Sequence, residues 1–430
     1  MATRAFRRIL VGWPVGKPMP NSFPNVQRKF SRRAVLAASI SVSEILTASC
    51  TAPSRLAAVP SSLTDRAQTP VPNARFFPDR NDAALVEEAM ASHRREIDWL
   101  ASTGHTGPLP PVAFLTISGG GGDGAFGAGL LTGWTATGKR PVFKLVTGIS
   151  TGALIAPFAF LGSRYDPQLA ETYTRVTDHD IFKRRNFTAA LFSDAMADTR
   201  PLARLVDKFL TRGLLDAIAE EYWKGRLLLV GTTNLDSREP VYWNMGAIAT
   251  STDPAALALF RQVTVASASI PGAFPPVMID VTVDGVRHQE MHVDGGATRQ
   301  VFMYPPTFRL AEESAAIGAA RQRGVYIIRN ARLDPDWASV DRRMLSIVNR
   351  AVSSLIQTQG FGDLNRMYLT TIRDQVDFNL AYIPADFTVP KKSQFDIEYM
   401  TQLFERGRQM AADGYPWAKH PPGFEPMGLP

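Results

Sequence analysis

Cysteine is almost absent from this 430-residue chain, in which Cys50 is the only one. A disulfide within the chain is therefore excluded, and the six histidines are scattered without the spacing that is typical of zinc ligands. No run of 18 or more apolar residues occurs, so the sequence predicts no permanent transmembrane helix. These absences together argue against a metal site and against a body that spans a membrane.

An excess of positive charge is also missing from most of the chain, although the formal net charge is +7. Eight of the 47 Lys and Arg residues and one of the 40 Asp and Glu residues lie within residues 1–49, which leaves 39 of each sign in the remainder. The remainder thus has no general attraction for polyanions, and the sequence predicts no nucleic-acid partner. Its 45% of hydrophobic residues is ordinary for a globular protein with a sizeable core.

Residues 1–50 have the features of a targeting segment. A basic leader precedes a short apolar run, as in a secretory signal, and the Arg32–Arg33 pair resembles a twin-arginine export signal. Cys50 lies where such a segment would be cleaved, so it is either the acylated cysteine of a lipoprotein or a free cysteine in an ordinary leader. We expect export to the periplasm or cell envelope, with lipid anchoring through Cys50 as one alternative. Residues 51–75 are predicted to be a linker.

Residues 76–430 are predicted to form the folded body. Short apolar runs rich in β-branched residues alternate with segments of helical spacing, which is typical of an α/β fold with a largely parallel sheet. One predicted helix contains Pro157, which is expected to kink or shorten it. Residues 335–430 are predicted to be a helical extension that follows core motifs at residues 112–300. The predicted strands are 111–118, 142–147, 226–235, 240–245, 290–296 and 323–330, and the predicted helices are 82–101, 125–134, 153–161, 341–357 and 395–413.

A candidate nucleophile lies between a predicted strand and a predicted helix, in the sequence Gly148-Ile149-Ser150-Thr151-Gly152. This G-x-S-x-G pattern places a serine on a sharp turn, where its oxygen stands clear of the sheet. The flanking glycines permit close packing and strained backbone angles. The start of the following helix favours developing negative charge. Because the pattern is short, its strand–turn–helix setting gives it most of its weight.

A run of glycines from Gly119 to Gly122 follows another predicted strand. Acyl transfer develops an oxyanion, and backbone N–H groups of glycines at a helix start can converge on it without obstruction by side chains. The same region contains a formal G-x-G-x-x-G at residues 122–127, which is the alternative of a dinucleotide site. The acidic residue expected about 20 positions later is missing, and no P-loop is present, so we favour the oxyanion loop.

Asp294 begins the sequence Asp294-Gly295-Gly296 at the end of a predicted strand. Its carboxylate could take the proton of Ser150 and return it to the leaving group, although a plain Asp-Gly turn gives the same pattern. A Ser-His-Asp triad is the rival arrangement. It would need one of His288, His292 or His420, and only His420 follows Asp294, in a Pro-rich tail. His292 shares a strand face with Asp294 if the strand is regular, and its role stays open.

These three motifs together resemble the patatin-like phospholipase family. The glycine-rich segment, the G-I-S-T-G-A-L elbow and V-D-G-G occur in the family's order, and supporting segments are D-T-R-P-L (198–202), T-N-L-D-S-R-E-P-V-Y (233–242) and A-S-A-S-I-P-G-A-F-P-P (266–276). The resemblance implies a three-layer α/β/α fold with a mainly parallel central sheet and a serine lipid acyl hydrolase that needs no cofactor. It also implies a Ser150–Asp294 dyad without histidine and an oxyanion loop at residues 119–122.

Asp123 departs from the family pattern, which usually has Arg or Lys after its glycines. An acid turned towards a developing oxyanion would oppose it, whereas a salt bridge that points away would remove the conflict. We expect a lipid or phospholipid ester as substrate and a membrane surface as partner. The basic and apolar segment at residues 181–192 could touch lipid, or it could be a helix with a solvated basic face. Two alternatives stay open: an inactive lipid-binding envelope protein on the same fold, and a Ser-His-Asp esterase.

Overall fold

The computed structural model describes residues 54–80, 83–185, 194–335 and 337–424. The predictions of an export signal and of acylation at Cys50 fall outside these residues. So do Phe187, Leu191 and Phe192 of the segment considered for lipid contact. Within the described part of the chain, no helix is both long enough and apolar enough to cross a bilayer.

A nine-stranded sheet forms the centre of the fold. Five neighbouring strands run parallel in the order β6-β3-β2-β10-β11, and antiparallel strands complete the side next to β6. The parallel strands are β2 (Val112–Ile117), β3 (Phe143–Ile149), β6 (Leu227–Asn234), β10 (Arg323–Arg329) and β11 (Asp377–Tyr382). The antiparallel ones are β1 (Arg75–Phe76), β7 (Glu239–Asn244), β8 (Val277–Val283) and β9 (Val286–Asp294), and a separate ribbon pairs β4 (Lys183–Arg184) with β5 (Ala197–Asp198).

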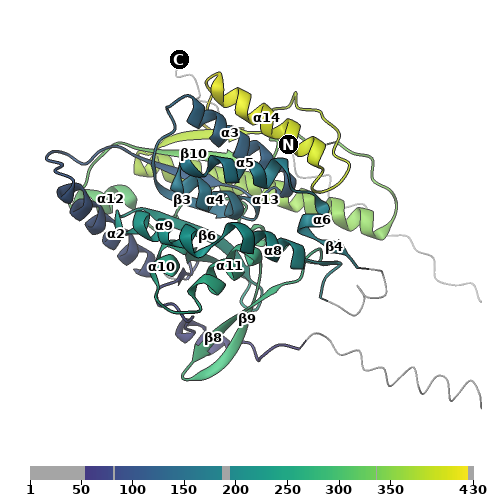
Figure 1. Cartoon of the computed structure of the whole chain (residues 1–430), viewed down its shortest axis with the longest axis horizontal. Coiled ribbons are helices and arrows are strands. Elements are labelled where there is room, and N and C mark those ends of the chain that lie inside the picture. Colours follow the sequence, from purple (N-terminus) through teal and green to yellow (C-terminus); the bar gives the residue numbers. More distant parts are fainter. Residues whose placement is uncertain (1–53, 81–82, 186–193, 336, 425–430) are drawn as a thin grey trace, which may run out of the picture. The chain divides into compact units, whose positions relative to one another are not determined.

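Helices cover both faces of this sheet, which confirms the predicted three-layer α/β/α fold (Figure 1). One layer contains α3 (Gly124–Ala136), α4 (Thr151–Leu161), α5 (Asp166–Thr174), α8 (Arg200–Phe209), α9 (Arg212–Trp223), α11 (Ala256–Ser267) and α14 (Ile397–Ala412). The other contains α2 (Ala83–Ser102) and α13 (Met344–Asp374), with α12 (Leu310–Ala316) beside α13. The remaining short elements are η1 (Ser61–Arg66), η2 (Gly121–Asp123), η3 (Ser163–Tyr165), α6 (Asp178–Ile181), α10 (Met245–Thr250) and η4 (Gly295–Ala297).

The apolar runs predicted as strands are buried because both faces of the sheet are covered. In β2, Phe114 packs into the core on one face while Leu115 and Ile117 pack into the core on the other. A parallel strand buried in this way is apolar at consecutive positions rather than at alternate ones. Pro157 lies inside α4 without ending it, since the helix continues to Leu161.

The predicted helical extension at residues 335–430 needs correction, because β11 lies within it. This strand pairs in parallel with β10 over six residues and forms an edge of the main sheet. The helix α14 packs along α3, in the layer above the predicted oxyanion loop. The C-terminal third is therefore part of the central architecture.

The predicted linker at residues 51–75 also needs correction in its described part. Gln68 pairs with Thr282 of β8 through two backbone hydrogen bonds of 2.9 Å. Val71 and Ala74 are buried in the core, and Arg75 belongs to β1. Although the segment is rich in Ala, Pro and Ser, it adds a strand to the sheet and closes over the β8–β9 hairpin.

Candidate active site

The register of three strands brings Ser150 and Asp294 to one place. Ile149, the last residue of β3, lies opposite Gly231 of β6, and Asp294, the last residue of β9, lies opposite the next residue, Thr232. The two strands thus follow one another along the same side of β6. Ser150 follows the last residue of β3 and therefore lies beside Asp294, the last residue of β9. Both residues are at the carboxyl edge of the parallel sheet, which is the usual place for a ligand site in such folds.

Ser150 occupies the strained turn that the sequence predicts. Its φ of 54° and ψ of −122° are unfavourable for a residue with a side chain, so the surrounding structure must hold it there. The flanking glycines allow this geometry, because a Cβ on Gly148 would lie 2.3 Å from the carbonyl oxygen of Gly152. A Cβ on Gly152 would lie 2.2 Å from the carbonyl oxygen of Ile117. Strand β2, strand β3 and helix α4 therefore meet backbone to backbone around the serine.

Replacing Gly152 with alanine should destabilise the fold, because the added methyl group meets backbone atoms that have no rotamer to change. We expect a loss of about 1–3 kcal/mol in the free energy of unfolding, as is common for overpacked cores. Chemical denaturation of wild type and Gly152→Ala measures it. Gly213→Ala is the matched control, since that glycine is exposed in α9 with no atom nearer than 4.0 Å to the added Cβ. Equal stability of the two variants would contradict the close packing inferred at the elbow.

Asp294 is buried and lies next to Ser150 in the register of the strands. Burial raises the pKa of Asp294 to about 6, and the hydrogen bonds from the Ser150 side chain and the Gly296 N–H act in the opposite direction. The Gly296 N–H donates to Asp294 Oδ1 at 2.7 Å, which fixes the orientation of the carboxyl group. A carboxylate with a pKa near neutrality is suited to accept and return a proton.

The A-S-A-S segment (residues 266–269) at the end of α11 binds the backbone N–H groups of Ser150 and Asp294. The N–H of Ser150 donates to Ser267 Oγ at 3.0 Å, and the Ser267 hydroxyl donates to the carbonyl oxygen of Gly231 at 2.6 Å. The N–H of Asp294 donates to the carbonyl oxygen of Ser269 at 2.9 Å. The sequence resemblance singled out this segment without a role, and the structure gives it one: it fixes the backbone of the nucleophile and of the acid.

The glycine loop lies against Ser150. A Cβ on Gly119 would be 3.2 Å from the Ser150 Cβ, so only a glycine allows this approach without displacement of the serine. The N–H of Gly119 donates to the carbonyl oxygen of Gln300 at 3.3 Å and is already engaged. The N–H groups of Gly121 and Gly122 begin η2, where no earlier carbonyl of the helix can accept them. Of the four glycines predicted for the oxyanion loop, Gly120 to Gly122 thus offer the available donors.

Two residues that the sequence did not indicate clamp this loop. Asn330, which is fully buried after β10, donates from its N–H to Ser118 Oγ at 2.9 Å and from Nδ2 to the Ser118 carbonyl oxygen at 3.0 Å. Its Oδ1 accepts the N–H of Gly127 at 3.1 Å. Gln300 joins the loop to the acid, since its Nε2 donates to the Gly296 carbonyl oxygen at 2.8 Å. The position of Asn330 at the end of a predicted strand was the only available signal.

Asp123, the residue that departs from the family pattern, forms a salt bridge with Lys391 at 2.8 Å. Lys391 belongs to the segment between β11 and α14, and the same segment touches the glycine loop. A Cβ on Gly121 would lie 2.3 Å from Gln394 Nε2, and a Cβ on Gly122 would lie 2.5 Å from the Gln394 carbonyl oxygen. The acid is thus paired with a cation, as expected for a salt bridge that removes the conflict with an oxyanion, and the pair fastens this segment to the loop.

Reversing the charge of Asp123 should weaken this attachment. In Asp123→Lys two ammonium groups face each other, and we expect lower activity on a short ester and a loss of about 0.5–1 kcal/mol in stability, the range of partly exposed ion pairs. Lys391→Asp should have the same sign of effect. The double variant Asp123→Lys/Lys391→Asp restores the pair and should recover both quantities, which a double-mutant cycle measures. Activity of Asp123→Lys at or above wild type, without Lys391→Asp, would show that the pair has no role at the loop.

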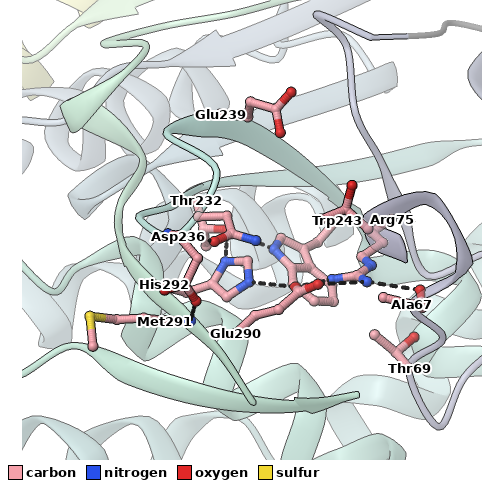
Figure 2. Close-up of polar contacts among 12 residues, drawn as sticks. Ala67, Thr69, Arg75, Thr232, Asp236, Glu239, Trp243, Glu290, Met291 and His292 are labelled. Atoms are coloured by element: carbon pink, nitrogen blue, oxygen red, sulfur yellow. Dashed lines mark hydrogen bonds and ion pairs between the residues drawn. The ribbon is translucent and has the colours of Figure 1, made fainter. Parts of the chain in front are cut away.

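His292 belongs to a separate buried network (Figure 2). Its Nδ1 lies 2.9 Å from Thr232 Oγ1, which also accepts the Trp243 indole N–H at 2.8 Å, and its Nε2 lies 3.1 Å from Glu290. Glu290 in turn forms an ion pair with Arg75. Burial opposes ionisation of Glu290, but the hydrogen bond from His292 and the nearby Arg75 outweigh it and lower the pKa of Glu290 to about 2.

The protons of this network follow from its charges. The ionised Glu290 accepts from His292 Nε2–H, which leaves Nδ1 as the acceptor for the Thr232 hydroxyl. Burial lowers the pKa of His292 below its usual value, so the imidazole stays neutral. His288 and His420 interact with the carbonyl oxygens of Ala57 and Pro421. Among the described residues, the hydrogen bonds of these three histidines lead to Thr232, Glu290 and backbone carbonyls, and none of these bonds leads to Ser150.

The Ser150 site contains no metal cluster among the described residues, and it is separate from an apolar cavity elsewhere in the fold. Over the described ranges, no group of three or more His, Cys, Asp or Glu side chains is arranged to hold a metal ion. An apolar cavity of about 120 Å³ lies between α2, α12 and the first halves of the parallel strands, lined among others by Leu85, Leu145 and Leu310. Its lining includes none of the site residues described above.

The model of the patatin-like phospholipase family matches residues 115–304. The chain contains a patatin-like phospholipase domain. The matched range includes the glycine loop, Ser150 and Asp294, and it ends before Asn330 and Lys391.

Two solved structures resemble the chain at low identity. VipD from Legionella pneumophila has 12% identity and a TM-score of 0.34, over 70% of this chain and 66% of VipD. Human GIVD cytosolic phospholipase A2 has 11% identity and a TM-score of 0.32, over 80% of this chain and 64% of that protein. The chain thus spans just under two thirds of the length of either structure. No curated protein matches it.

Proposed function

We propose that the protein is a serine lipid acyl hydrolase that cleaves carboxylic esters of lipids or phospholipids. The observation that carries this proposal is the proximity of two groups beside a glycine loop with available N–H donors. Ser150 is held in a strained turn, and Asp294 is buried with a raised pKa. The patatin-like phospholipase domain supports a lipid ester rather than another acyl substrate. No cofactor is needed for this chemistry.

The reaction proceeds in two acyl-transfer steps. Ser150 Oγ attacks the ester carbonyl carbon while its proton passes to the Asp294 carboxylate. The oxyanion is stabilised by N–H donors of Gly120 to Gly122 and by the start of α4. Collapse of the tetrahedral intermediate breaks the ester C–O bond, and Asp294 returns the proton to the departing alcohol. A water molecule, deprotonated by Asp294, then attacks the acyl-enzyme, releases the fatty acid and restores the Ser150 hydroxyl.

We place this activity at a membrane surface, because esterified lipids are found there and because the targeting pattern at residues 1–50 predicts export to the cell envelope. Export and acylation of Cys50 stay predictions. The second candidate is an inactive lipid-binding envelope protein on the same fold. The departure at Asp123 favoured it, but the pairing of Asp123 with Lys391 removes most of that argument.

Loss of the dyad should abolish hydrolysis. We expect wild type to cleave both a p-nitrophenyl ester and a phospholipid vesicle, and Ser150→Ala and Asp294→Asn to reduce kcat at least about 10³-fold on both substrates, since single members of such a unit are not replaceable. Circular dichroism and thermal unfolding establish that the variants are folded. His420→Gln is the control for a hidden triad and should keep the wild-type rate, since His420 is the histidine that follows Asp294 and its ring interacts with the Pro421 carbonyl oxygen. An inactive wild type would favour the lipid-binding alternative.

The pH dependence should report Asp294 as the general base. Because burial raises the pKa of Asp294 to about 6, the carboxylate form is lost as the pH falls through 6. We expect kcat/KM on the soluble ester to be constant above pH 7 and roughly tenfold lower at pH 5, as one titrating base requires. Initial rates between pH 4.5 and 8.5, read at a wavelength insensitive to nitrophenol ionisation, measure the profile. A profile that stays level down to pH 4.5 would exclude this assignment.

A further inference from the structure

The first half of α13 carries an exposed apolar stripe. Met344 is 76% exposed, Val348 50% and Leu355 70%, and Trp337 just before the helix is 87% exposed. Met344, Ile347, Val348, Val352, Leu355 and Ile356 recur at intervals of three and four residues, so they share one side of the helix. The opposite side carries polar residues, among them Ser346, Ser353 and Gln357. A contiguous stripe of exposed apolar side chains marks an interaction site.

This stripe is not an extension of the side of α13 that packs on the sheet. Leu364 and Met367 in the second half of the helix are buried in the core. Met344, Val348 and Leu355 lie about half a turn away from Leu364 when about 3.6 residues make a turn. The apolar residues of the first half therefore lie on the side of the helix that faces away from the core, where Leu369 and Ile372 of the second half are exposed as well.

The exposed half of α13 projects from the edge of the sheet that carries Ser150. Because α13 connects two parallel strands, its end lies at the amino edge of the sheet and its start at the carboxyl edge. Gly360 contacts Arg329, the last residue of β10, since a Cβ there would lie 2.4 Å from the guanidinium. Asp363 accepts the N–H of Gln300 at 2.6 Å, next to the glycine loop. Residues 344–359 lie before these contacts and span roughly 24 Å along the helix axis.

We propose that this overhang, residues 337–359, is the surface that docks on an anionic lipid membrane. The proposal rests on the proposed lipid hydrolase function, which requires the carboxyl edge of the sheet to face the substrate. Between Trp337 and Gln359 the chain has three arginines, Arg342, Arg343 and Arg350, and one acid, Asp341. An apolar helix face that follows Trp337, Arg342 and Arg343 and has Arg350 on its polar side is suited to the headgroup region of anionic lipid. If a second copy of the chain covered the stripe, the arginines of the two copies would lie close together and repel each other.

A fluorophore placed on either side of the helix tests this surface directly. In the full chain with Cys50→Ser, Leu355→Cys and Ser353→Cys each provide one site for nitrobenzoxadiazole on opposite sides of α13. Vesicles of phosphatidylglycerol and phosphatidylcholine should shift the emission at position 355 to shorter wavelength and raise its intensity about threefold or more, with little change at position 353. Pure phosphatidylcholine should have a weaker effect. Equal responses at both positions, or none at position 355, would overturn the proposal.

Substitution of the stripe separates docking from chemistry. Met344→Ser/Val348→Ser/Leu355→Ser should reduce hydrolysis of anionic vesicles by at least about tenfold and leave the soluble ester unaffected, because the three side chains lie away from the core. Ser353→Gln on the polar side is the matched control. Light scattering gives the oligomeric state, and a wild-type dimer that dissociates in the triple variant would overturn the proposal in favour of a second copy. If wild type does not hydrolyse the soluble ester, the proposed function fails while the fluorescence result still decides the docking.

Discussion

The active-site geometry depends on the two strands that follow one another along β6. β3 ends opposite Gly231 and β9 ends opposite Thr232, so a change of one residue in the register of β9 would move Asp294 away from Ser150. The His292 network lies on the same strand and ties β9 to Thr232 and, through Glu290, to Arg75 of β1. The buried histidine is therefore part of what fixes the register, and thus the acid.

The site holds its two reacting groups in states that a free chain would avoid. Ser150 has a backbone conformation that favours glycine, and Asp294 is a buried carboxyl group with a pKa near 6. Because the native pKa is raised above that of the unfolded chain, Asp294 lowers the stability of the fold as the pH rises from about 4 to about 6. The close packing at Gly148 and Gly152 and the hydrogen bonds of the A-S-A-S segment hold the backbone of Ser150 and Asp294 in place and so offset these two costs.

Sequence alone was sufficient where a motif is local and insufficient where contacts join distant segments. The positions of Ser150, Asp294 and the glycine loop in the fold were predictable because each lies at the end of a strand with a recognisable pattern, whereas their catalytic roles stay predictions. Strand β11 was missed because Asp377 and Asn379 interrupt its apolar run. In the structure both side chains accept hydrogen bonds from the Lys419 ammonium group. The pairing of Gln68 with Thr282 of β8 was missed because backbone hydrogen bonds, rather than apolar periodicity, make this contact. Asn330 and Gln300 had no signature that predicts a clamp.

The glycine loop predicted to hold the oxyanion is supported by residues outside the matched range of the family. The match ends at residue 304, yet the loop is held by Asn330 after β10, by the Asp363–Gln300 contact from α13 and by Lys391 before α14. The position that usually has a basic residue here has Asp123, and the base comes instead from residue 391. Lys391 forms an ion pair with Asp123. Since the C-terminal segment supplies one member, residues beyond 304 belong to the site itself, and truncation near the end of the matched range would remove the support of the loop.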